Sequence, residues 1–189
     1  GLEARVRRFL ALWSRERRGQ QARVDAGCGA GAYTRILGGE GHRVVGVDYS
    51  VPALRKAVAR SSHAAGFVAA DVRRLPFGAE EFDGVLCFGV TQALAESDAM
   101  VRELGRLVRP GGELWVDALN GSCAIHAAGR MWRLALRRPP HLRYESPRRL
   151  RDICRRNGFA EVTLHWMPIV PRNAPRAQRM IESPAVAWL

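Results

Sequence analysis

Three aspartates and a run of glycines are the residues in this sequence best suited to binding a small polar ligand. Asp25 precedes a turn, GCGAG, in which glycines fill alternate positions, and Asp48 lies 17 positions beyond the last of them. Glycine lets the backbone approach a ligand closely, and a carboxylate accepts hydrogen bonds from hydroxyl or amino groups. The pattern therefore predicts a site for a nucleoside-like ligand, with Asp48 on the ribose hydroxyls and Asp71 on an adenine amino group.

Each of these residues also has a purely structural interpretation. A glycine turn can be a tight strand-to-helix connection without a ligand, and Asp48 can cap the helix that follows it. Asp71 suits a turn. Phe88, at the carboxyl end of the fourth expected strand, suits core packing as well as the border of a ligand site. Each of these residues alone is weak evidence for a ligand site, and the evidence comes from their order along the chain.

The glycine turn differs from the fingerprint of dinucleotide-binding domains. That fingerprint reads GxGxxG and opens a helix whose N-terminus faces a pyrophosphate. Here the spacing is GxGxG, with Tyr33 two residues beyond the last glycine. The second carboxylate, Asp71, is also foreign to the dinucleotide pattern. A nicotinamide-dependent dehydrogenase is therefore disfavoured.

Alternating strands and helices must position these residues. We expect strands over residues 22–27, 42–50, 65–71, 81–89, 113–119 and 160–169. We expect helices over residues 2–13, 32–39, 51–62, 96–108, 127–138 and 146–159, the last opened by Ser146 as a cap. This alternation predicts a Rossmann-like, doubly wound, mostly parallel α/β sheet with helices on both faces. The candidate residues then meet at the carboxyl ends of the strands, where such sheets bind ligands.

Five motifs, taken in order, resemble those of class I S-adenosylmethionine-dependent methyltransferases of the small-molecule branch. They are VDAGCGAG, VVGVDYS, AADVRRLPF, EFDGVLCFGV and VRELGRLVRPGGELWV, which fall within residues 24–119. SPRRLRDICRRNGF extends the resemblance more weakly. The family's sheet ends in an antiparallel strand that is missing here. We therefore expect the sequence to be a truncated piece of a longer protein, with an unprotected edge at the strand expected over 160–169.

The resemblance implies that the loop after the first strand holds the methionine part of the cofactor. Asp25 and the loop residues Gly27, Cys28, Gly29 and Gly31 take this role, with backbone groups meeting the amino and carboxylate ends. Cys28 is a small packing residue in this loop and not a nucleophile.

The resemblance places the rest of the cofactor along the next three strands. Asp48 binds both ribose hydroxyls, and Tyr49 flanks the adenine ring. Asp71 and the backbone of Val72 meet the adenine edge. Phe88 and its loop close the site beside the sulfonium.

The implied reaction is transfer of a methyl group by in-line displacement to a small-molecule acceptor or a lipid-like or sugar-like one. The cofactor carries the difficult chemistry, and the protein aligns the acceptor and excludes water. A general base is needed only when the acceptor arrives protonated. His126, His141 and Tyr144, in the irregular segment 120–144, are candidates for that base, and ordinary lid residues are the alternative.

The charge of the chain leaves other acceptors open. The formal net charge is +12, and Lys56 is the only lysine, so the excess is almost entirely arginine. An RNA or protein methyltransferase is one alternative, and nucleic acid is a conceivable partner. The arginines are spread along the chain, which favours a compositional bias instead. A non-catalytic module that binds S-adenosylmethionine is the alternative from a different class.

The remaining features concern the cellular location and the domain organisation of the protein. No apolar run is long enough to span a bilayer, and the arginine-rich start is unlike a signal peptide, so we expect a cytoplasmic protein. The four cysteines form no CxxC pair and no metal-ligand spacing. We expect residues 1–20 to form a helix that covers the cleft or lies on a membrane surface, 21–170 the cofactor-binding domain with a lid over 120–144, and 171–189 a C-terminal segment. The oligomeric state stays open.

Overall fold

The computed structural model describes residues 9–12, 20–61, 66–122, 124–137 and 142–165. The chain divides into two compact units, residues 20–162 and a second unit made of residues 1–19 with 163–189. Residues 9–12 are helical, as predicted, whereas the rest of the helix expected over 2–13 lies outside the described residues, as do His141 and the C-terminal segment 171–189. The description below concerns the unit 20–162.

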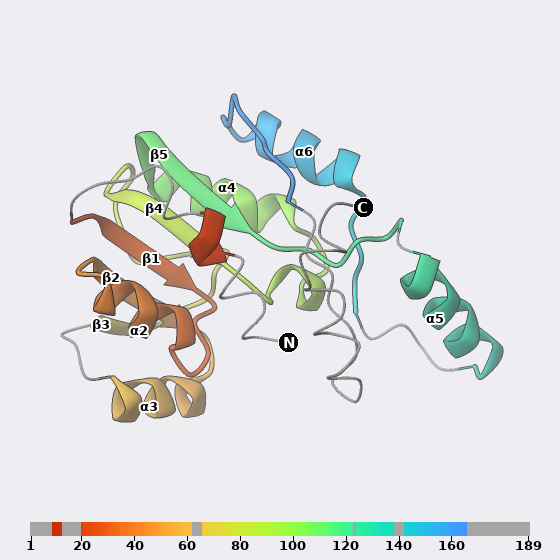
Figure 1. The fold of residues 1–189 in the computed structure, drawn as a ribbon, viewed down its shortest axis with the longest axis horizontal. Coiled ribbons are helices and arrows are strands. Elements are labelled where there is room, and N and C mark those ends of the chain that lie inside the picture. The colour runs from red at the N-terminus through yellow and green to blue at the C-terminus, as the bar shows by residue number, and fades with distance from the viewer. Residues whose placement is uncertain (1–8, 13–19, 62–65, 123, 138–141, 166–189) are drawn as a thin grey trace. The chain divides into compact units, whose positions relative to one another are not determined.

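Five strands form one sheet in the order β3-β2-β1-β4-β5 (Figure 1). Every pairing is parallel, so the predicted α/β class is confirmed. The strands are β1 (Ala22–Ala26), β2 (Arg43–Asp48), β3 (Gly66–Ala69), β4 (Phe82–Cys87) and β5 (Val108–Val116).

The strand order reverses between β1 and β4, and this reversal distributes the helices. The chain steps outward from β1 to β3, then returns to β4 beside β1 and continues to β5. Because crossover connections are almost always right-handed, helices before and after the reversal cover opposite faces. The helices are α2 (Ala32–Gly39), α3 (Val51–Arg60), α4 (Asp98–Leu107), α5 (Ala124–Ala135) and α6 (Pro147–Arg156), with the short 3₁₀ helix η1 (Thr91–Ala93).

Two helices begin at capping serines. The Ser50 hydroxyl accepts a hydrogen bond from the amide of Ala53 at 3.4 Å, and Ser146 accepts one from the amide of Arg149 at 3.2 Å. Each cap is followed by proline near the first helical position, where its missing N–H costs nothing. The predicted cap at Ser146 is therefore confirmed.

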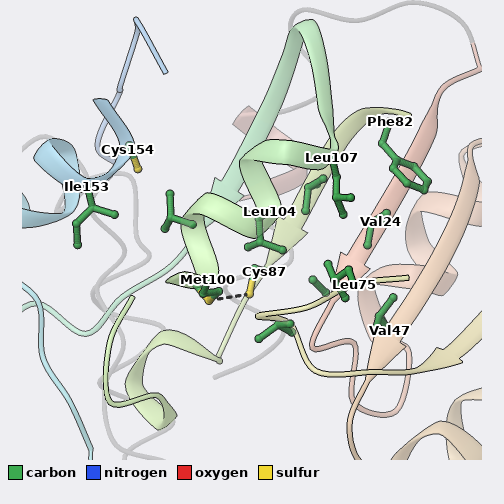
Figure 2. Close-up of a cluster of buried hydrophobic side chains, with 14 residues drawn as sticks. Val24, Val47, Leu75, Phe82, Cys87, Met100, Leu104, Leu107, Ile153 and Cys154 are labelled. Carbon is green, nitrogen blue, oxygen red and sulfur yellow. Dashed lines mark hydrogen bonds between the residues drawn. The ribbon is translucent and has the colours of Figure 1, made fainter. Parts of the chain in front are cut away.

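The core lies between α4 and the sheet (Figure 2). Met100, Val101, Leu104 and Leu107 recur at helical spacing and are fully buried. They pack with strand residues such as Val24, Val47 and Val85 in one cluster, which Ile153 of α6 joins. Burying one such side chain contributes about 1.5–3 kcal/mol to the free energy of folding. The buried face of α4 therefore holds in place the strands whose carboxyl ends carry the candidate site.

Two expectations about strands are wrong. β5 begins at Val108, directly after α4, because Val108 pairs with Phe82. Residues 109–112, RPGG, then form an irregularity within the strand before Glu113 pairs with Gly84, and Gly111 takes a left-handed φ of +74° there. The sixth strand, expected over 160–169, is also absent over its described part, residues 160–165. Val162, one of the apolar residues that suggested a strand, packs on the core cluster without strand pairing.

Candidate active site

The glycine loop lies at the carboxyl end of β1 and is folded onto the end of β2. The amides of Gly27 and Cys28 both donate to the carbonyl of Val47, at 2.7 and 2.9 Å. Gly27, Gly29 and Gly31 have left-handed φ values of +78°, +54° and +73°, a region that glycine enters without steric cost. The alternating glycines therefore follow from the shape of the loop.

Two of these glycines face very different surroundings. A Cβ at Gly27 would lie 2.2 Å from Cγ2 of Val90, which belongs to the loop after β4. A Cβ at Gly29 would meet no atom within 4 Å. The loop is thus packed against its neighbour at Gly27 and open at Gly29.

Asp25 is a buried carboxylate that fixes the start of α2. Its Oδ2 accepts hydrogen bonds from the Thr34 amide at 2.9 Å and the Thr34 hydroxyl at 2.6 Å. Burial raises the pKa of Asp25 to about 6, against the lowering effect of the Thr34 bonds and with a smaller raising effect from the charge of Asp48. At neutral pH the group is mostly ionised. Its hydrogen bonds to Thr34 connect the residue before the glycine loop to the helix after it.

Asp48 connects the glycine loop to the entry of α3. Its Oδ2 accepts from the Gly29 amide at 2.8 Å, and its Oδ1 accepts from the Ser50 amide at 2.8 Å. The neighbouring Tyr49 side chain is 84% exposed. The structure thus brings Asp48 and Gly29 into contact, and it leaves the Tyr49 ring on the surface beside them.

Asp71 is tied to a neighbour on the surface after β3. Its carboxylate accepts from Nε of Arg73 at 3.0 Å and from the Arg73 amide at 2.9 Å. These bonds hold the pKa of Asp71 below its ordinary value. The amide of Ala70 donates to the carbonyl of Asp48 at 3.2 Å, which keeps this end of β3 beside β2. The side chain of Val72 belongs to the core cluster.

The loop after β4 carries an aromatic contact and a carboxylate that the sequence analysis missed. The ring of Phe88 packs on that of Tyr33, with centroids 4.9 Å apart. The amide of Gly89 donates to Oδ1 of Asp117 at 2.6 Å, and the hydroxyl of Thr91 donates to the Asp117 carbonyl. Asp117 follows β5, the neighbour of β4. Its position at the end of that strand could have identified it from the sequence.

Cys28 has the properties of a packing residue. Its side chain is buried, and burial, with smaller effects from the charges of Asp25 and Asp48, raises the pKa of the thiol to about 12. A nucleophilic cysteine needs a thiolate near neutral pH. Among the described residues there is also no cluster of His, Cys, Asp or Glu suited to hold a metal ion.

A cavity of about 730 Å³ lies where the loop after β4 meets the segment that follows α5. Its lining includes Gln92, Ser122 and Tyr144. The amide of Arg143 donates to the carbonyl of Gln92 at 2.9 Å, which joins the two segments. Of the three candidate bases, Tyr144 therefore lines this cavity, and His126 belongs to α5.

Comparison with known proteins gives a consistent result. A family model described as a methyltransferase domain matches residues 24–116. A malonyl-[acyl-carrier protein] O-methyltransferase of Pseudescherichia vulneris is 36% identical over 89 residues, 47% of this chain and 35% of that protein. A ubiquinone biosynthesis O-methyltransferase of Pseudomonas paraeruginosa is 32% identical over 116 residues, 57% of this chain and 49% of that protein. The chain thus spans half or less of the length of these relatives.

Solved structures show the same fold. A putative methyltransferase of Bacillus halodurans superposes with a TM-score of 0.70 at 19% identity, covering 87% of this chain and 72% of that one. A phosphoethanolamine N-methyltransferase of Haemonchus contortus, in complex with S-adenosyl-L-methionine, gives 0.71 at 20% identity, covering 96% of this chain and 44% of that one.

The all-parallel sheet and its strand order are the fold of the solved methyltransferases. Within the chain, residues 24–116 belong to the methyltransferase domain family. The class and fold predicted from the sequence are therefore confirmed, and with them S-adenosylmethionine as the cofactor of the class.

Proposed function

We propose that this chain binds S-adenosylmethionine at the carboxyl ends of β1 to β4 and transfers its methyl group to a small-molecule acceptor. The observation that carries the proposal is the pairing of a left-handed glycine loop with Asp48, whose Oδ2 lies 2.8 Å from the Gly29 amide. This pairing puts a carboxylate and an open stretch of backbone side by side. A ligand with adjacent hydroxyls and a charged amino acid end fits both.

The residues present fit the cofactor. The loop is open at Gly29, where a Cβ would meet no atom within 4 Å, so a ligand could approach the backbone closely there. Asp48 would accept from the ribose hydroxyls, because its two carboxylate oxygens have lone-pair sites beyond the bonds from the Gly29 and Ser50 amides. Asp71 would hold the adenine amino group in competition with Arg73. The cofactor, when bound, supplies a methyl group on a positively charged sulfur.

The acceptor site in this proposal is the cavity lined by Gln92, Ser122 and Tyr144. Its volume of about 730 Å³ is in the range of small-molecule sites, about 300–1,000 Å³. The names of the relatives, which include O-methyltransferases, favour an acceptor oxygen. Tyr144 is the candidate to take up its proton, and the roles of His126 and His141 stay predictions.

Calorimetric titration of the chain with S-adenosylhomocysteine and with NAD tests the cofactor part. We expect binding of S-adenosylhomocysteine only. Hydrogen bonds to a charged group contribute about 1.5–3 kcal/mol, so Asp48→Asn should weaken binding by roughly 10- to 150-fold. Asp152→Asn, at an exposed position on α6, is the matched control and should leave affinity unchanged. Binding of NAD alone, or equal affinity in both variants, would reject the proposed site.

Transfer to an acceptor needs a separate assay. Incubation with cofactor labelled on the methyl group and a metabolite extract should give a labelled product of low molecular mass. Label found only in RNA or protein would exclude the small-molecule acceptor and leave the cofactor site untouched. Cofactor binding without any labelled product would instead support the non-catalytic alternative.

A further inference from the structure

Helix α5 exposes an apolar face to solvent. Met131, Trp132 and Leu134 are 72%, 68% and 77% exposed, and Leu136, just past the helix, is 47% exposed. We call these four residues the α5 apolar face. Among the described residues, the other large hydrophobic side chains with this much exposure are Tyr49, Val51 and Val58. Exposed apolar side chains gathered in this way mark an interaction surface.

The positions between the apolar residues carry positive charge. Arg130 and Arg133 lie three positions apart on α5, and Arg137 follows two residues after the helix ends at Ala135. From residue 118 to residue 144 the sequence has five arginines and no aspartate or glutamate. Of these five, Arg143 is ion-paired with Glu145. The stretch around α5 is therefore basic throughout, and a partner surface must tolerate or attract that charge.

The charge decides between occupants. A second copy of the chain, packed face to face across a two-fold axis, would bring arginines against arginines, which costs free energy. An anionic lipid surface attracts them instead, by about 1 kcal/mol for each basic residue near it. Tryptophan, leucine and arginine are also the residues of helices that lie in the plane of a membrane interface. No helix in the described part of the chain has the length and apolar character to cross a membrane.

The two ends of the segment that carries α5 are held to each other. Asn120 and Glu145 form a parallel bridge, in which the Gly121 amide donates to the Glu145 carbonyl and the Glu145 amide to the Leu119 carbonyl, both at 2.9 Å. Figure 1 shows α5 (teal) extending from this bridge, apart from the strands. The apolar face can therefore enter a lipid surface without loss of core packing.

We propose that α5 is an interfacial helix that inserts the α5 apolar face into the surface of a membrane containing anionic lipid. In this arrangement Arg130 and Arg137 meet the phosphate groups of the lipids. The inference does not depend on the proposed function, because its test contains no cofactor and no methyl acceptor.

Co-sedimentation of the full chain with vesicles tests the proposal. We expect binding to vesicles of phosphatidylcholine mixed with phosphatidylglycerol, decreasing with added salt, and little binding to phosphatidylcholine alone. The double variant Trp132→Ala with Leu134→Gln should bind at least tenfold less, because both side chains lose apolar burial. Val58→Gln, on α3 at 57% exposure, is the matched control and should bind as the unmodified chain does.

A second pair of variants tests the charge. Arg130→Gln with Arg137→Gln should weaken binding to anionic vesicles by roughly 30-fold, from about fivefold for each arginine. Arg55→Gln with Arg60→Gln removes the same charge from exposed positions of α3 and should have little effect. Circular dichroism of every variant establishes that the fold is intact.

Three results would overturn the proposal. The first is no binding to anionic vesicles, and the second is binding that survives the Trp132 and Leu134 substitutions. The third is a dimer in sedimentation equilibrium that those substitutions dissociate, since a second copy would then cover the α5 apolar face.

Discussion

The contact between the glycine loop and Val90 allows a quantitative test of why Gly27 is glycine. Gly27 and Gly29 have similar left-handed φ values, +78° and +54°, so alanine at either position should cost about 1–2 kcal/mol in backbone strain. The surroundings differ, because the new Cβ at position 27 would lie 2.2 Å from Cγ2 of Val90, whereas at position 29 it would meet no atom within 4 Å.

The expected costs follow from this difference. Forcing a methyl group into an occupied space typically costs about 1–3 kcal/mol. Gly27→Ala should therefore lower the free energy of unfolding by about 2–5 kcal/mol, the sum of strain and overlap. Gly29→Ala should lower it by about 1–2 kcal/mol. Urea unfolding followed by circular dichroism measures both values.

A double-mutant cycle separates the two causes. Val90→Ala removes Cγ2 and leaves Cβ, which would lie 3.7 Å from the new atom at position 27, an ordinary contact distance. The double variant should therefore recover about 1–3 kcal/mol relative to the sum of the single variants. Equal costs at positions 27 and 29, or additivity within about 0.5 kcal/mol, would refute the role assigned to the Val90 contact.

Three further predictions concern stability. Because the pKa of Asp25 is raised from 3.8 to about 6 by folding, the folded chain favours its protonated form, and that contribution is lost as pH rises from about 4 to 6. Over this window the free energy of unfolding of the unmodified chain should fall by roughly 3 kcal/mol relative to that of Asp25→Asn. Urea unfolding measured at several pH values gives both curves, and parallel curves would contradict the raised pKa of Asp25. Leu104→Ala, at a fully buried position, should cost about 2–5 kcal/mol, whereas a cost below 1 kcal/mol would mean that α4 does not hold the core. Ser146→Ala should cost about 1 kcal/mol through loss of the α6 cap, and Ser146→Thr, which keeps the hydroxyl, should restore most of it.

Local signals were sufficient for most of the sheet and its helices. The bounds of α2, residues 32–39, agree with the prediction, because the glycine turn marks its start and a glycine pair its end. Strands β1 to β4 and the cap at Ser146 were predicted for similar reasons. These features depend on residues near one another in the sequence, so periodicity, caps and turn residues determine them.

The features that sequence reasoning missed depend on partners far apart in the chain. Val108 is part of β5 only because Phe82 lies beside it, and residues 160–165 lack a strand because apolar alternation alone supplies no hydrogen-bonding neighbour. Asp117 was missed because its partner, the Gly89 amide, lies 28 positions away. The sequence singled out Asp48 and Gly29 as candidate residues, whereas the hydrogen bond between them at 2.8 Å is known only from the structure.

The bridge between Asn120 and Glu145 divides the domain into a constant part and an exchangeable part. Because the two chain ends of the 121–144 segment are already held together there, the cost of closing the loop depends only weakly on what lies between them. Insertions, deletions or replacement within residues 122–142 should leave the sheet unit intact, because Arg143 and its ion pair with Glu145 are kept. This joint is therefore a position at which a segment of different length or surface chemistry could be exchanged without altering the parallel sheet.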